Sequence, residues 1–297
     1  MDLEKLKKRP DCFYYTDNGV LLCGDCLKIM PELEPVDLVV TSPPYNCRKD
    51  YGSYDDEIPW PEYYLFMDSC LSKFYKNLRD GGVVAINIPT VIRYQHDHKH
   101  RETWNDFDPS YIGHRNGARV LGRGRIEPIS KKISSLMFSK DPHTREPIIW
   151  VKGKSEGGEI STSYMMGSDN NPYMRPCHEV ILLGSKKHWH HRGGTGRRGD
   201  IAVPYIDYTK DVWYIPPKSS RKHPAIWPEE IPKRLIILFT HAEDSIICDP
   251  FSGEGTTLFA CEKLNRRWIG IEISEDYCRI AKERIERELH QKKLPGF

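Results

Sequence analysis

Ser245-Ile-Ile-Cys-Asp-Pro-Phe-Ser-Gly-Glu-Gly-Thr-Thr257 is the stretch that most clearly indicates a fold. It predicts a buried strand ending at Asp249, a loop with Gly253 and Gly255, and the start of a helix. Glycines let a backbone approach a ligand closely, and a helix N-terminus offers free N–H groups. The next predicted strand ends at Glu272, 23 residues after Asp249, where an acid suits hydrogen bonds to ribose hydroxyls. This order of elements indicates a nucleoside cofactor in a Rossmann-like sheet.

The rest of the chain repeats the alternation of strand and helix. Helical spacing of apolar residues is seen in Glu62–Leu78, which we expect to stop at the turn Asp80-Gly81-Gly82, and in Thr256–Leu264. Ser274 can cap a last helix. These patterns predict an α/β fold with a largely parallel sheet. The predicted strands are Val36–Val40, Val83–Ile88, Pro147–Val151, Val180–Leu183, Ser245–Cys248 and Trp268–Ile271.

Composition excludes several classes of protein. The chain has 297 residues, 38% hydrophobic and 29% charged, so it is neither disordered nor built of membrane spans. Met1–Arg9 is charged and lacks the apolar stretch of a signal peptide, which predicts a cytoplasmic protein. Nine cysteines in a long chain do not indicate a disulfide framework. We expect one domain over residues 1–297.

Two polar stretches interrupt the alternation and are predicted to be insertions on one face of the core. The first, Arg93–Lys132, begins with several histidines. The second, Gly184–Lys222, holds nine Lys and Arg against three Asp, interleaved with aromatic residues. Nucleic acid offers both phosphates and stacking faces, so this second stretch is a candidate nucleic-acid-binding surface. The candidate DNA contacts are Lys186, Lys187, Arg192, Arg197 and Arg198.

A second constellation follows the predicted strand Val36–Val40. Ser42-Pro43-Pro44-Tyr45 forms a stiff loop, because both prolines fix φ and donate no N–H. Methylation of an exocyclic amine needs acceptors for the amino hydrogens, so that the nitrogen lone pair becomes available for attack. The Ser42 hydroxyl and a loop carbonyl can supply these acceptors. Tyr45 can stack on a base that has left the duplex, where its amine is otherwise unreachable.

The two constellations together resemble the motifs of DNA amino-methyltransferases. Asp249-Pro-Phe-Ser-Gly-Glu-Gly-Thr-Thr257 is similar to their S-adenosylmethionine loop, with Glu254 where a small residue is usual. Ser42–Tyr45 matches their Ser-Pro-Pro-Tyr catalytic motif. Since the catalytic loop comes first, the order resembles that of the permuted β class, in which the target-recognition region lies between the motifs. The resemblance implies that this region is Gly184–Lys222, with help from Arg93–Lys132. The resemblance implies a seven-stranded, mostly parallel sheet with helices on both faces.

The resemblance also implies roles for individual residues. Leu22–Asp25 resembles a strand whose acid contacts the adenine of the cofactor. Lys222–Pro228 resembles a segment that packs on the methionine part of the cofactor. Arg175–Leu183 resembles a later strand of the family. The implied catalytic residues are Ser42, Pro43, Pro44 and Tyr45. The implied cofactor-binding residues are Asp25, His223, Pro224, Asp249, Pro250, Phe251, Ser252, Gly253, Gly255, Thr256, Thr257, Glu272 and Ile273.

Other residues with chemical potential are given structural interpretations. Cys23 and Cys26 have redox spacing but no second pair, and Cys177 is interpreted as a packed residue, because amine methylation needs no thiolate. The histidine clusters could bind a metal, yet methyl transfer from a sulfonium requires none. No metal site is therefore predicted.

The target and partners follow from the resemblance. Ser-Pro-Pro-Tyr usually accompanies N4 of cytosine, which is favoured over N6 of adenine. An RNA or protein amide methyltransferase and a non-catalytic DNA-binding module are the alternatives. The expected partner is double-stranded DNA, with a cognate restriction endonuclease if the protein serves a restriction–modification system. The protein is expected to act as a monomer or homodimer.

Overall fold

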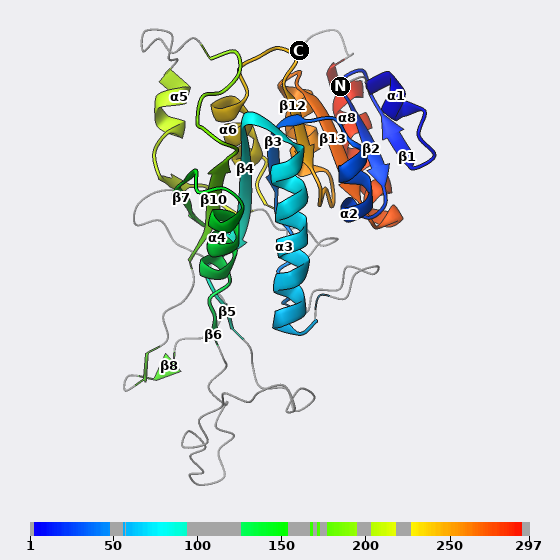
Figure 1. Cartoon of the computed structure of the whole chain (residues 1–297). Helices are drawn as coiled ribbons and strands as arrows, with labels where there is room; N and C mark the ends of the chain where they lie inside the picture. The colour runs from blue at the N-terminus through cyan, green and yellow to red at the C-terminus, as the bar shows by residue number, and fades with distance from the viewer. Residues whose placement is uncertain are drawn as a thin grey trace.

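The computed structural model describes residues 3–47, 56, 58–93, 126–153, 167–168, 171–172, 177–194, 203–217 and 227–292. Its centre is one sheet of nine strands (Figure 1). In spatial order these are β1 (Cys12–Tyr15), β2 (Gly19–Cys23), β13 (Arg267–Glu272), β12 (Ile246–Asp249), β3 (Val36–Thr41), β4 (Leu78–Pro89), β10 (His178–Ser185), β7 (Thr144–Val151) and β11 (Val212–Tyr214). Two short pairs lie outside this sheet: β5 (Ile92–Arg93) with β6 (Ile126–Glu127), and β8 (Gly167–Ser168) with β9 (Asn171–Pro172).

The sheet is mostly parallel, as predicted, but larger than expected. Strands β2, β13, β12, β3 and β4 pair in parallel, and β10 runs antiparallel between β4 and β7. The seven expected strands correspond to β2 through β7 in the spatial order. Strand β1 adds an antiparallel edge and β11 a parallel one, so the expected number of seven was too low.

Helices cover both faces of the sheet, and each face has its own hydrophobic core. On β2, Val20 and Leu22 pack into one core while Leu21 packs into the other, because side chains alternate along a strand. The first core includes α1 (Leu3–Lys7), α2 (Cys26–Ile29), the 3₁₀ turn Met30–Glu32, α3 (Trp60–Asn77) and α4 (Ile129–Lys140). The second includes α5 (Val203–Tyr208), α6 (Glu230–Phe239), α7 (Thr256–Lys263) and α8 (Glu275–Lys292).

All six predicted strands are present, and each belongs to the central sheet. One boundary was wrong. Helix α3 ends at Asn77 and β4 begins at Leu78, so the expected turn Asp80-Gly81-Gly82 is part of the strand. Gly81 has φ +76° there, and a Cβ on it would lie 2.2 Å from the His190 carbonyl oxygen. The glycine therefore permits a close backbone contact within the strand and not a reversal of the chain.

The described part of the predicted recognition region is built into the fold. Strand β11 pairs with β7, and Trp213 is almost fully buried. Tyr205 and Tyr208 pack against the second core, and the Arg145 guanidinium lies 4.2 Å from the ring centre of Trp189. These aromatic residues thus pack against the core and against basic residues from outside the stretch, Arg145 of β7 and Arg234 of α6. Residues 94–125 of the predicted insertion 93–132 lie outside the described residues.

Within the described residues, no helix has both the length and the apolar character needed to cross a membrane.

Candidate active site

The two predicted loops lie side by side at the carboxyl ends of neighbouring strands. Strands β3 and β12 pair in parallel, with Leu38 opposite Ile247. The Thr41 hydroxyl at the end of β3 donates to Asp249 Oδ1 at the end of β12, over 2.7 Å. The chain continues from β12 toward β13 on one side and from β3 toward β4 on the other. This is a topological switch point, where open α/β sheets bind their ligands.

The loop after β3 is fixed by contacts on both sides of its prolines. The Tyr63 hydroxyl of α3 donates to the Pro44 carbonyl over 2.8 Å. Asn46 adopts φ +56°, and its backbone N–H donates to Asp56 Oδ1 over 2.7 Å. The Asn46 side chain exchanges two hydrogen bonds with the backbone of Ile58. The stiffness predicted from the prolines is thus reinforced by the residues around them.

Tyr45 is buried in a polar network. Its side chain is only 7% exposed, and its hydroxyl lies 2.7 Å from Ser42 Oγ. Asn87 Nδ2, from β4, donates to the Tyr45 hydroxyl over 2.8 Å and to Glu179 Oε2 over 2.7 Å. Lys152 forms an ion pair with Glu179. The hydroxyl, and not only the ring, therefore has defined partners, while stacking of the ring on a base stays a prediction.

Asn87, Glu179 and Lys152 were not among the predicted site residues. A signal for Asn87 was present, because it is the one amide within the apolar run Val83–Ile88. Glu179 starts an apolar strand and is 9% exposed, which is costly for a carboxylate without partners. Strands β4 and β10 are adjacent, and this adjacency brings the two side chains together.

The loop after β12 is closed by Glu272. The carboxylate at the end of β13 accepts from Gly253 N over 2.7 Å and from Ser274 N over 2.9 Å. Gly253 and Gly255 have φ of +51° and +73°, which non-glycine residues rarely adopt. A Cβ on Gly255 would also lie 2.9 Å from the Ala281 Cβ of α8. Both glycines are therefore required by the path of the loop.

Two buried acids give this end of the sheet its electrostatic character. Burial raises the pKa of Asp249 to about 6, against hydrogen bonds that lower it. Burial likewise raises the pKa of Glu272 above its ordinary value, against its backbone hydrogen bonds. The described partners of both are hydroxyl and backbone N–H groups. Negative charge here is thus only partly compensated by the protein.

The remaining predicted cofactor residues surround this loop. Asp25 caps α2 by accepting from Leu27 N over 2.9 Å, next to Gly24, whose N–H donates to the Glu272 carbonyl. Phe251 packs against Phe66, with ring centres 6.0 Å apart. Ile273 is half exposed, while Pro250, Ser252, Thr256 and Thr257 lie in the loop and the first turn of α7. His223 and Pro224 lie outside the described residues.

Comparison with known proteins assigns the family. A family model described as DNA methylase, of the N6/N4 type, matches residues 36–283. The chain belongs to the N6/N4 DNA methylase family. It is 27% identical over 287 residues to the Type II methyltransferase M.HpaI of Haemophilus parainfluenzae, covering 91% of this chain and 75% of that one. It is 26% identical to M.BamHI of Bacillus amyloliquefaciens, covering 96% of this methylase but 61% of the relative.

Solved structures confirm the Rossmann-like methyltransferase fold. A Thermus thermophilus protein described as a putative DNA modification methylase, complexed with S-adenosyl-L-methionine, superposes with a TM-score of 0.64 at 24% identity. The match covers 93% of this methylase and 95% of that chain. PvuII DNA methyltransferase, described as cytosine-N4-specific, also gives 0.64, at 17% identity over 95% of this methylase and 93% of that chain.

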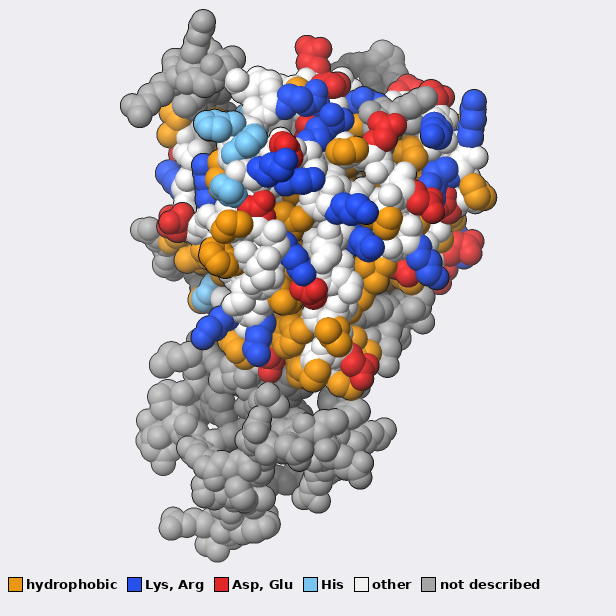
Figure 2. Space-filling model, viewed as in Figure 1, with side chains coloured by type: hydrophobic (Ala, Val, Ile, Leu, Met, Phe, Trp, Pro, Cys, Tyr) orange, Lys and Arg blue, Asp and Glu red, His pale blue; other side chains and the backbone are white. Residues whose placement is uncertain are grey.

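Three predicted DNA contacts of this methylase lie at the other end of the sheet. Lys186 donates to the Leu78 carbonyl, and Lys187 forms an ion pair with Asp80. Arg192 donates through Nε and Nη2 to the two carboxylate oxygens of Asp37, over 3.1 and 3.2 Å. In Figure 2 basic and histidine side chains gather near the top of the face, among acidic ones. The structure does not bring these cations to the catalytic loop, and Arg197 and Arg198 lie outside the described residues.

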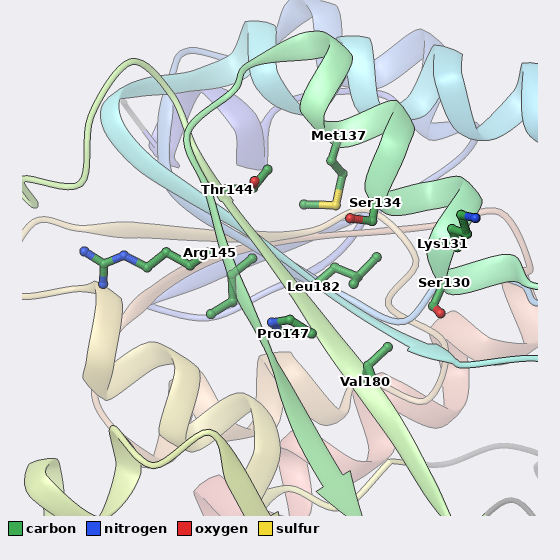
Figure 3. A pocket seen from close by; sticks show the side chains of 10 residues that line it. Ser130, Lys131, Ser134, Met137, Thr144, Arg145, Pro147, Val180 and Leu182 are labelled. Atoms are coloured by element: carbon green, nitrogen blue, oxygen red, sulfur yellow. The ribbon is translucent and has the colours of Figure 1, made fainter.

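A pocket of the methylase lies between α4 and the sheet (Figure 3). Met137 and Ser134 of α4 face Leu182 of β10 and Pro147 of β7 across it. Its walls are mostly aliphatic, and none of the residues assigned to either loop lines it. The pocket is therefore separate from the candidate active site.

Proposed function

We propose that this methylase transfers a methyl group from S-adenosylmethionine to the exocyclic amine of a base flipped out of duplex DNA. The observation that carries the proposal is the junction of the two loops through the Thr41–Asp249 hydrogen bond. Ser42 and Tyr45 follow β3 beside the glycine loop after β12, which Glu272 closes by accepting from Gly253 N. An acceptor for an amine and a cradle for a nucleoside cofactor thus lie at the carboxyl ends of two neighbouring strands.

The residues present fit S-adenosylmethionine. Glu272 and Asp25 lie where acids can accept from the ribose and adenine, and Gly253 and Gly255 let the loop backbone approach the cofactor closely. Asp249 is a buried carboxylate without a cation among its described partners, which suits a ligand that carries positive charge. When bound, the cofactor supplies an electrophilic methyl group on a positively charged sulfur.

The chain's own residues act on the amine. Ser42 Oγ and a carbonyl of the proline loop accept the two amino hydrogens, so the nitrogen lone pair is less delocalised into the base. Ser42 is a poor base, so the amine attacks first and its surplus proton then passes to water. Tyr45 holds the extruded base by stacking, which requires its buried ring to turn outward or the loop to open.

We favour N4 of cytosine as the acceptor. Ser42 stands where methylases of adenine usually carry an Asp, and PvuII DNA methyltransferase is described as cytosine-N4-specific. N6 of adenine is the alternative, because either side chain can accept an amino hydrogen. A cognate restriction endonuclease is the proposed partner, since the relatives include Type II methyltransferases.

The decisive experiment is mass spectrometry of nucleosides from DNA of cells that express this protein, against cells that express Ser42→Ala. A rise in N4-methylcytosine in the first culture alone is expected. A rise in N6-methyladenine keeps the enzyme and overturns the base assignment. The same DNA without either mark would contradict the proposed function.

A further inference from the structure

Glu179 is connected to the catalytic serine through one tyrosine. Its carboxylate lies at the start of β10, and Oε2 is 3.4 Å from the Tyr45 hydroxyl. That hydroxyl is 2.7 Å from Ser42 Oγ. Asn87 contacts both Tyr45 and Glu179 through Nδ2, and Lys152 pairs with the other carboxylate oxygen. The result is a hydrogen-bond chain that runs from the Ser42 hydroxyl through the Tyr45 hydroxyl to the Glu179 carboxylate, which is paired with the Lys152 ammonium group.

The direction of this chain is restricted by its fixed members. A carboxylate only accepts hydrogen bonds, so the Asn87 atom beside Glu179 must be the amide nitrogen, which only donates. The same nitrogen donates to the Tyr45 hydroxyl. Among its described partners, Glu179 and Ser42 can accept the Tyr45 hydrogen, and the negative charge of the carboxylate attracts it.

The two directions have opposite consequences for the amine. When Tyr45 donates to Glu179, Ser42 donates to Tyr45, and the Ser42 lone pairs face the substrate. When Tyr45 donates to Ser42, one Ser42 lone pair is taken and the Ser42 hydrogen is free to point at the substrate as a donor. An amino group needs an acceptor, whereas a carbonyl at the same place on a base needs a donor.

We propose that Glu179 is a positioning residue that fixes the chain in the order Ser42, Tyr45, Glu179, and thereby makes Ser42 an acceptor. The proposal rests on the proposed function, because it concerns how the same loop receives an amine. It adds a specificity role: a base with an exocyclic amine is accepted, and a base with a carbonyl in its place is rejected. Asn87 and Lys152 support the role by holding the two carboxylate oxygens.

The test is the first-order rate of methyl transfer in a single turnover, with cofactor affinity measured in parallel. Glu179→Gln removes the negative charge that attracts the Tyr45 hydrogen. When the amide oxygen pairs with Lys152, the amide nitrogen faces Tyr45 as a donor, so the direction of the hydrogen bonds is no longer fixed. We expect the rate to fall about 100-fold, as for the loss of one preorganised hydrogen bond, with little change in cofactor affinity. The matched control is Glu127→Gln. Glu127 is also buried, and it accepts from the Tyr64 hydroxyl over 2.7 Å, but it is not in this chain.

A double-mutant cycle separates positioning from general damage. Tyr45→Phe removes the middle hydroxyl, so adding Glu179→Gln to it should cause no further loss of rate. A wild-type rate in Glu179→Gln, an equal loss in Glu127→Gln, or fully additive losses would each overturn the proposal. Thermal unfolding shows whether each variant is folded. If Glu179→Gln does not fold, a wild-type rate of methyl transfer in Tyr45→Phe would overturn the proposal. No transfer by the wild type refutes the proposed function itself, whereas transfer that the variants leave unchanged refutes only the role of Glu179.

Discussion

The two ends of the central sheet surround their buried acids in different ways. At the carboxyl ends of the strands, Asp249 and Glu272 are held by hydroxyl and backbone N–H groups, and burial raises the pKa of both. At the amino ends, Asp37 receives two hydrogen bonds from the guanidinium of Arg192 and one from Ile246 N, with Arg79 3.6 Å away. At the carboxyl ends the negative charge is left for a ligand to compensate. At the amino ends the charge of Asp37 is compensated by arginines of the protein itself.

The comparison separates a functional end from a stabilising end. An uncompensated buried carboxylate costs folding free energy, whereas a paired one becomes costly only when its partner is removed. Substitutions at the two ends should therefore change different quantities. At the amino ends they should lower the free energy of unfolding, and at the carboxyl ends they should change ligand binding and the pH dependence of stability.

The largest effect is expected for Asp37→Ala. It leaves the Arg192 and Arg79 guanidinium groups and the Ile246 N–H without their common acceptor. The guanidinium groups are about one third exposed, and Arg192 keeps Asp244 as a partner, so most of the cost comes from the buried Ile246 N–H. We expect the free energy of unfolding to fall by about 2–4 kcal/mol, the cost of an unsatisfied buried donor together with a partly exposed ion pair. Urea unfolding followed by circular dichroism measures it. A loss below about 1 kcal/mol, the usual worth of an exposed pair, would contradict the stabilising role.

A second prediction concerns pH. The pKa of Asp249 is about 6 in the folded protein and ordinarily 3.8, so the folded state binds more protons in that window. Its contribution to stability is therefore present at lower pH and is lost as pH rises through about 6. The shift corresponds to roughly 3 kcal/mol. Asp249→Asn should not show this loss. Its free energy of unfolding should therefore rise relative to that of the wild type as pH increases from 3.8 to about 6. Urea unfolding across the window tests it, and parallel profiles would contradict it.

A third prediction concerns the cofactor. Glu272→Ala should weaken binding of S-adenosylmethionine by about 1.5–3 kcal/mol, the worth of hydrogen bonds to a charged group. The variant also loses the acceptor that holds Gly253 N. Isothermal titration calorimetry gives the dissociation constant. Glu275→Ala, an exposed acid at the start of α8, is the control and should bind as the wild type does. Equal affinities in all three proteins would remove Glu272 from the site.

The smallest effect is expected for Asp80→Ala. Asp80 and Lys187 form an exposed ion pair at the amino ends, where solvent screens the interaction. Neither the melting temperature nor the rate of DNA methylation should change measurably. A clear drop in the rate of methylation without a change in melting temperature would instead support the prediction that Lys187 and its neighbours contact DNA.

Both loops could be predicted from the sequence because their chemistry is local. Pro43, Pro44, Gly253 and Gly255 restrict the backbone within a few residues, and Glu272 follows one strand later. These signals do not depend on distant partners. The structure places the two loops together because they follow neighbouring parallel strands.

The partners of charged side chains could not be predicted in the same way. Asp37 and Arg192 are 155 residues apart, and nothing near Arg192 indicates that its charge is already paired. The same holds for Trp189, whose cation–π partner is Arg145 and not a base. Glu179 and Asn87 were missed because their contact depends on the register of β10 against β4, which the sequence does not reveal.

The order of the strands also has a consequence for synthesis. Strands β2 and β3 are made early, but β13 and β12 lie between them in the finished sheet. A ribosome must translate as far as Glu272 before that gap can close, and until then both early strands have an open edge. The nascent chain therefore has no complete central sheet for most of its elongation, and the interval during which it can aggregate or recruit chaperones is correspondingly long.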